Sequence, residues 1–90
     1  MDEVSASKAA ARGAQAEALL NSELFKEVCQ TLREEYIGAW KITHYKETEG
    51  RERLWQAVQI VGKVEDHIKK IAANGRVASQ DLARIRTNSK

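Results

Sequence analysis

The strongest constraint on the fold of this chain is a repeat of apolar residues in its second half. The repeat has alternating intervals of three and four positions: Leu54, Ala57, Val61, Val64, Ile68 and Ile71. Because an α-helix has about 3.6 residues per turn, this spacing places all of them on one side of a helix, as in a coiled-coil seam. The spacing predicts a helix over about 49–73 that packs against another helix.

A second apolar stripe precedes this repeat, and its members are again three or four positions apart: Phe25, Val28, Leu32, Tyr36 and Trp40. Asn21 and Ser22, which are favourable N-cap residues, lie directly before it. The pattern predicts a helix over about 22–42. The polar stretch and the glycine that follow predict a turn over 43–48.

Folding these two helices about Glu47 brings mostly apolar residues together, for example Leu32 and Val61. We therefore expect a long antiparallel helical hairpin. A hairpin buries each helix on one side only, and Trp55 and Ile60 widen the apolar surface of the second helix beyond its seam. Apolar area is left for an N-terminal helix, a second copy of the chain or another protein.

The N-terminal segment differs in composition, because residues 5–20 are rich in alanine, the best helix former. Ser5 or Ser7 can supply the N-cap oxygen. Small residues on one face, Gly13 among them, would let another helix backbone approach closely. The alternative is a segment that becomes ordered only against another element, because isolated helices of this length are marginal in water.

Asn74 and Gly75 predict the end of the long helix, because a glycine just past the last turn commonly takes the left-handed conformation. A basic tail over 76–90 follows, with at most one short helical turn. The fold class expected is all-α, with one domain over 1–90 that consists of the hairpin, the alanine-rich N-terminal helix and the short C-terminal tail.

Large apolar side chains are scarce for a chain of 90 residues. Thirteen of the apolar residues are alanines, and Leu, Ile, Val and Phe together number 19. A chain of this size also buries a smaller fraction of its surface than a larger domain does. We therefore expect a homo-oligomer or a complex with another protein.

Reactive residue types are present, but not in the patterns that catalysis or metal binding requires. His44 and His67 lack the spacing of a helical zinc site, and Cys29 has no neighbouring Cys or His. The glycines are isolated and form no nucleotide-binding loop. We predict no enzymatic activity, no cofactor and no metal site.

The net charge of +2 is too balanced for nucleic acid to bind across the whole surface. Only the tail is basic, so a weaker set of candidate nucleic-acid contacts consists of Arg76, Arg84, Arg86 and Lys90. The competing interpretation is a solubilising tail. No apolar run approaches the roughly 20 residues that cross a bilayer, and we expect no membrane role.

Aromatic and large apolar residues of the hairpin are the candidates for partner binding: Phe25, Tyr36, Trp40, Trp55 and Ile60. Aromatic side chains are common anchors of protein interfaces. The alternative is that Trp40 and Trp55 cover the end of the hairpin core against each other.

Several short segments together carry a family resemblance: Ala11–Gly13, Ala18–Asn21, Leu24–Phe25 with Glu27, Tyr36–Trp40 with Thr43, Arg51–Trp55 and Asn74–Gly75. In these segments the chain resembles small helical proteins encoded among the structural and morphogenesis genes of tailed bacteriophages and prophages. The resemblance covers roughly residues 10–83. It implies a role in virion assembly, in the virion or the host bacterial cytoplasm, and no catalytic residue.

The resulting prediction is a non-enzymatic phage structural or assembly protein. It would act through helix-mediated self-association or by binding another virion protein. Two alternatives belong to other classes: a nucleic-acid-binding packaging accessory that resembles a small terminase subunit, and an inhibitor of a host protein that uses the aromatic end of the hairpin.

Overall fold

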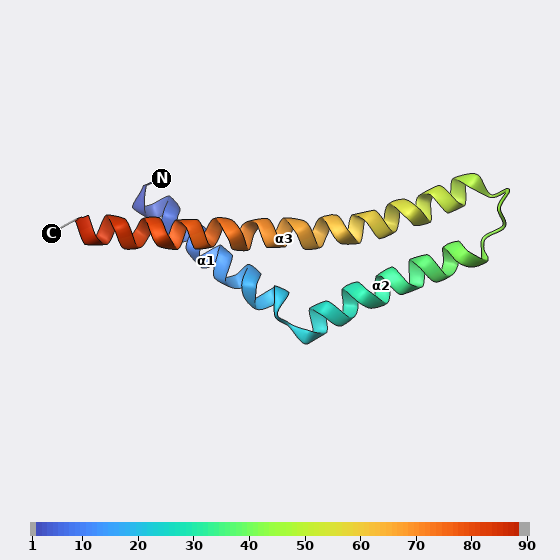
Figure 1. The fold of residues 1–90 in the computed structure, drawn as a ribbon, viewed down its shortest axis with the longest axis horizontal. Helices are drawn as coiled ribbons and strands as arrows, with labels where there is room; N and C mark the ends of the chain where they lie inside the picture. Colours follow the sequence, from blue (N-terminus) through green and yellow to red (C-terminus); the bar gives the residue numbers. More distant parts are fainter. Residues whose placement is uncertain (1, 89–90) are drawn as a thin grey trace. The chain divides into compact units, whose positions relative to one another are not determined.

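The computed structural model describes residues 2–88, and nearly all of them are helical (Figure 1). The helices are α1 (Glu3–Leu20), α2 (Glu23–Ile42) and α3 (Thr48–Asn88). No strand occurs within this described range. The predicted all-α fold class is confirmed.

The described residues divide into two compact units. One unit combines the chain up to Asn21 with the part from His67 onward, and the other spans Ser22–Asp66. The long helix α3 contributes to both, because its first part packs with α2 and its second part packs with α1.

The first helix begins at an aspartate and not at Ser5 or Ser7, as the sequence had suggested. The Asp2 carboxylate accepts a hydrogen bond from the Ser5 backbone N–H at 2.7 Å, which makes Asp2 the N-cap of α1. Aspartate caps a helix as well as serine does, so the helix begins before both serines. The hydrogen bond favours the charged carboxylate and holds the pKa of Asp2 below its ordinary value.

Acid should loosen the first turn of α1. Folding lowers the pKa of Asp2 below its ordinary value of 3.8. The stabilisation by the charged Asp2 carboxylate is therefore complete above pH 3.8 and is lost as the pH falls through the lower pKa of the folded state. In an NMR titration, the Ser5 amide shift should move with a midpoint below 3.8. Asp2→Asn should keep the cap and abolish this titration. A midpoint at or above 3.8 in the wild-type protein would show that the capping hydrogen bond does not form.

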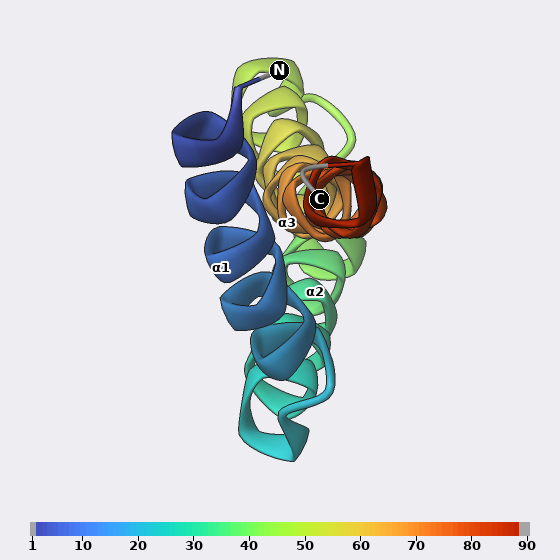
Figure 2. The same ribbon diagram turned by 90° about the vertical axis from the view of Figure 1, so that its left-hand side faces the viewer.

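In the first unit, α1 crosses the C-terminal part of α3 at a pair of glycines (Figures 1 and 2). A Cβ atom placed on either Gly13 or Gly75 would lie only 2.5 Å from the Cα atom of the other. Both glycines are buried, and so are several alanines of the two helices: Ala6, Ala16, Ala72 and Ala78. The close backbone approach predicted from the small residues of α1 is therefore confirmed.

The predicted helix end at Asn74 and Gly75 is wrong, since α3 continues to Asn88 and no described residue has a positive φ. The described part of the predicted tail, 76–88, is therefore helical. Gly75 lies seven positions after Ile68 and continues the apolar repeat, which reaches Ala78, Leu82 and Ile85. Glycine is needed here to admit the backbone of α1. Ala78 and Leu82 then form a buried cluster with Ala6 of α1.

In the second unit, α2 lies beside the first part of α3, and residues 43–47 connect the two helices (Figure 1). Ser22 is the N-cap of α2, as predicted, and its hydroxyl accepts a hydrogen bond from the Phe25 N–H at 3.2 Å. The first turn of α3 has the hydrogen bond expected at a helix start, because the Glu47 carbonyl accepts from the Arg51 N–H at 3.0 Å. Glu47, directly before Thr48, therefore takes the cap position of α3.

Arg51 forms hydrogen bonds across the end of this unit at which residues 43–47 connect α2 and α3. Its Nη1 donates hydrogen bonds to the carbonyls of Trp40, at 3.1 Å, and Thr43, at 2.9 Å. Its guanidinium carbon also lies 4.1 Å from the centre of the Trp40 ring, a cation–π contact. Arg51 therefore satisfies terminal carbonyls of α2 and ties the end of α2 to the start of α3.

Candidate functional site

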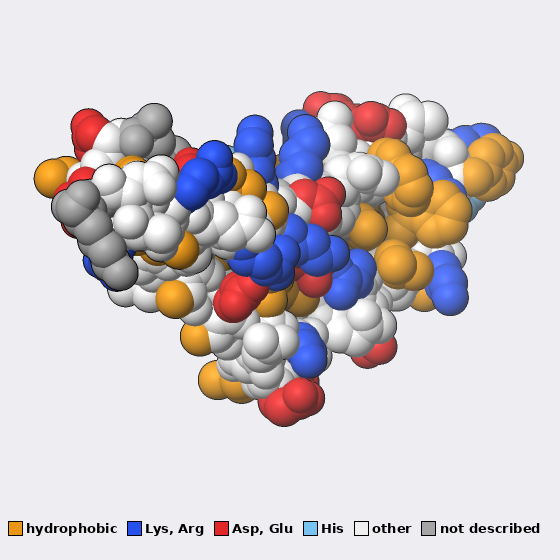
Figure 3. Space-filling model, turned by 60° about the vertical axis from the view of Figure 1, so that its left-hand side comes forward, with side chains coloured by type: hydrophobic (Ala, Val, Ile, Leu, Met, Phe, Trp, Pro, Cys, Tyr) orange, Lys and Arg blue, Asp and Glu red, His pale blue; other side chains and the backbone are white. Residues whose placement is uncertain are grey.

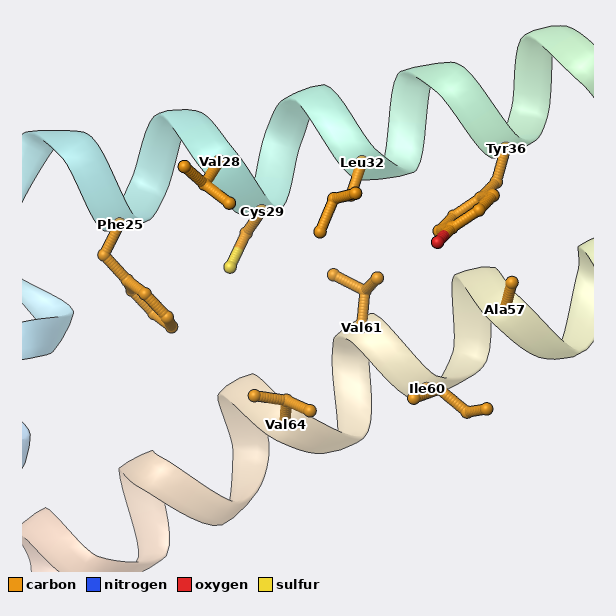
Figure 4. A pocket seen from close by; sticks show the side chains of 9 residues that line it. All are labelled: Phe25, Val28, Cys29, Leu32, Tyr36, Ala57, Ile60, Val61 and Val64. Atoms are coloured by element: carbon orange, nitrogen blue, oxygen red, sulfur yellow. The ribbon is translucent and has the colours of Figure 1, made fainter.

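An open apolar groove of about 360 Å³ lies between α2 and the first part of α3 (Figure 4). Leu32 and Val61 point toward each other across it, and the sulfur of Cys29 also faces into the gap. Cys29 and Val61 are buried, whereas the other lining side chains retain exposed surface. The lining consists of Phe25, Val28, Cys29, Leu32, Tyr36, Ala57, Ile60, Val61 and Val64.

One side of the groove is closed by an ion pair. Arg33 donates to the Glu65 carboxylate through both Nη atoms, with 3.5 Å between Nη2 and Oε2. These hydrogen bonds favour the charged guanidinium and raise the pKa of Arg33. The pair therefore bridges the two helices through charge-assisted hydrogen bonds on this side of the unit.

The opposite side of the groove has no such closure. Val28, Ile60 and Val64 are 46%, 56% and 48% exposed there. On α2, Val28 lies about 140° around the helix from Arg33, and on α3, Ile60 lies about 140° from Glu65. The Arg33–Glu65 pair thus lies on one side of the unit, and Val28 and Ile60 lie on the other.

A second exposed surface lies at the connection between α2 and α3, where Figure 3 shows apolar side chains gathered together. Ile42 and Tyr45 are 88% and 72% exposed. The His44 ring stacks on Tyr45 with 4.6 Å between ring centres. A shallow hollow of about 420 Å³ here is lined by Trp40, Tyr45, Thr48, Arg51, Glu52 and Trp55.

The predicted partner-binding residues fall on both of these surfaces. Phe25, Tyr36 and Ile60 line the groove, whereas Trp40 and Trp55 line the hollow. Trp40 stacks against the Arg51 guanidinium.

Sequence reasoning missed two features of this site. Val28 and Val64 had been assigned to the helix seams, but both are partly exposed on the open side of the groove. The contacts of Arg51 were not predicted either, because this residue was considered only as part of the segment Arg51–Trp55. An arginine that begins a helix directly after a turn is the available signal, because it can reach the last carbonyls of the preceding helix.

The basic residues proposed as nucleic-acid contacts are partly neutralised. The Nε of Arg76 donates to the Glu17 carboxylate at 2.6 Å, and Arg84 donates to Asp81 at 2.9 Å. Arg86 lies in the last turn of α3. Lys90 is outside the described residues.

The His44 side chain has a hydrogen-bond partner in the turn itself. The Nδ1 of His44 accepts a hydrogen bond from the Lys46 N–H at 3.1 Å. Within residues 2–88, no group of three His, Cys, Asp or Glu side chains is arranged to hold a metal ion. None of the helices in this range combines the length and the apolar character that crossing a membrane requires.

Comparisons with protein-family models, with curated proteins and with solved structures find no match to this chain. The resemblance to phage proteins therefore stays a prediction. The exposed groove and its chemistry are the basis of the function proposed below.

Proposed function

We propose that this protein is a non-enzymatic structural or assembly protein of a tailed bacteriophage and acts through helix-mediated association. The observation that carries the proposal is the apolar groove that the second unit leaves open. Self-association and binding to another virion protein would both cover it.

The small core supports this proposal. Only three of the buried hydrophobic residues in the described range are larger than alanine: Cys29, Val61 and Leu82. No large side chain there is fully buried. Scattered exposed hydrophobic residues are normal in a soluble protein, but a contiguous apolar face typically marks an interaction site.

The docking element in this proposal is an antiparallel hairpin formed by α2 and the first part of α3. Two contacts support this direction, because Arg51 meets Trp40 near the connection and Glu65 meets Arg33 further from it. A groove between two such helices accepts a third helix, whose apolar residues enter it at helical spacing. The phage origin follows from the resemblance, and the virion or the host bacterial cytoplasm would be the site of action.

The test is whether this protein enters particles. A tagged chain expressed from the phage or prophage genome that encodes it should copurify with virions or with assembly intermediates. Ile60→Glu, which places a charge in the groove, should reduce this copurification strongly, whereas Val77→Glu in the first unit is the matched control, since Val77 is also 56% exposed. Absence of the wild-type chain from both particles and intermediates would contradict the proposed function.

A further inference from the structure

The turn between α2 and α3 contains a histidine whose side chain and backbone both accept hydrogen bonds. The Lys46 N–H donates to the Nδ1 of His44 at 3.1 Å, and the Glu47 N–H donates to the His44 carbonyl at 2.9 Å. The His44 ring also stacks on the Tyr45 ring, with 27° between the ring planes. The His44 ring therefore contacts both of the residues that follow it in the turn.

These contacts require one protonation state of the imidazole. A neutral histidine ring has one nitrogen that donates and one that accepts, whereas a charged ring has two donors. Because Nδ1 accepts from the Lys46 N–H, the ring is neutral and carries its proton on Nε2. A proton on Nδ1 would point at the Lys46 N–H. The ring would then have to rotate away from this amide, and its stack on Tyr45 would be lost.

The surroundings of His44 provide no ion-pair partner for a charged ring. Within residues 2–88, His44 belongs to no ion pair. The Lys46 ammonium lies 5.9 Å from the centre of the Tyr45 ring, and Arg51 donates to the carbonyl of Thr43. The titratable and charged residues near His44 on α2, in the turn and on α3 are Lys41, Tyr45, Lys46, Glu47, Glu49, Arg51 and Glu52. Of the carboxylates among them, that of Glu49 pairs with Arg53.

We propose that this turn is a pH-sensitive device, in which protonation of His44 releases the Lys46 N–H and the Tyr45 ring. Histidine is the side chain that ordinarily changes charge between pH 5 and 8. The turn is closed at pH 8, where the ring is neutral, and loosened at pH 5. Arg51 stays charged at both values and keeps its hydrogen bonds to the carbonyls of Trp40 and Thr43. The ends of α2 and α3 therefore stay together while the turn changes.

Tyr45 extends this change to a larger surface. Its side chain lines the shallow hollow at this end of the unit together with Trp40 and Trp55. Tyr45 is 72% exposed, and the stack on His44 is its one contact with another ring among the described residues. Loss of the stack should therefore free the Tyr45 side of the hollow.

NMR of the full chain tests the two atoms of this device directly. At pH 8, a long-range 15N–1H spectrum should show the proton of the neutral His44 ring on Nε2. Between pH 8 and 5, the protection of the Lys46 amide against exchange, relative to an unstructured peptide of the same sequence, should fall about twofold to fivefold. This change corresponds to the loss of one solvent-exposed hydrogen bond. The Thr43 amide, which donates to the Trp40 carbonyl, is the internal control and should keep its protection.

His44→Asn is the matched variant. An asparagine side chain accepts from the N–H two positions later, as in an Asx turn, and does not titrate. In this variant the Lys46 amide should keep the same protection at pH 8 and at pH 5. His67→Gln removes the other histidine of the chain and should leave the response of Lys46 as in the wild-type protein.

Three results would overturn this proposal. One is a neutral His44 ring with its proton on Nδ1, because that nitrogen could not accept from the Lys46 N–H. The second is a Lys46 amide that keeps its protection while the His44 ring gains its second proton. The third is an equal loss of protection in His44→Asn, which would assign the pH response to another group.

Discussion

Gly75→Ala should lower the free energy of unfolding by about 1–3 kcal/mol, although alanine is the better helix former by about 1 kcal/mol. The new Cβ would lie 2.5 Å from the Gly13 Cα, and the next nearest atoms, the Ala9 carbonyl oxygen and the Gly13 nitrogen, also belong to the α1 backbone. A backbone cannot turn away as a flexible side chain can. The two helices would have to separate, and the buried alanines around the crossing would lose their contacts.

Gly62→Ala is the matched control for this substitution. Gly62 also lies inside α3, but a Cβ atom there meets nothing within 4 Å. This variant should gain about 0.5–1 kcal/mol, because alanine loses less conformational entropy in a helix. Urea denaturation followed by circular dichroism gives both values. If both alanine variants are stabilised to the same degree, α1 does not cross α3 at Gly75.

Val61→Asp should destabilise the second unit by about 3–5 kcal/mol, which is in the range expected for an unpaired charge in a core. Val61 is 8% exposed and faces Leu32 across the groove. None of the side chains that line the groove carries a positive charge that could pair with a carboxylate. α2 should therefore lose its contact with α3, and its amides should exchange faster with solvent.

Gln59→Asp is the control for Val61→Asp, since Gln59 is exposed and lies two positions away on the same helix. It introduces the same charge and should change stability by less than about 0.5 kcal/mol. Thermal unfolding by circular dichroism and hydrogen exchange of the α2 amides measure both effects. Equal melting temperatures for the two variants would mean that Val61 does not lie in a core.

The two units hide apolar surface by different means. In the first unit, glycine and alanine let two helix backbones approach closely, and the buried cluster includes Ala6, Ala78 and Leu82. In the second unit, larger side chains hold the helices apart, and only Cys29 and Val61 are buried. This difference explains why the docking groove of our proposal lies in the second unit.

Local patterns were sufficient to predict much of the secondary structure. The stripe from Phe25 to Trp40 and the Ser22 cap predicted α2 within one residue, because both depend on side chains three or four positions apart. The apolar repeat of α3 was recognised for the same reason. Asp2 was overlooked as a cap, although it offers the same local hydrogen bond as a serine.

The roles of Gly75 and of the groove depended on contacts between distant parts of the chain. Glycine suits both a left-handed helix end and a close helix crossing, and only the presence of Gly13 against it decides between them. Likewise, Arg33 and Glu65 are 32 positions apart, and their pairing determines which side of the second unit is closed. The sequence by itself therefore determined where the helices form, since that depends on neighbours within about one turn. Only the tertiary structure decided which helix faces meet and which stay open, because those contacts join residues that the chain brings together from far apart.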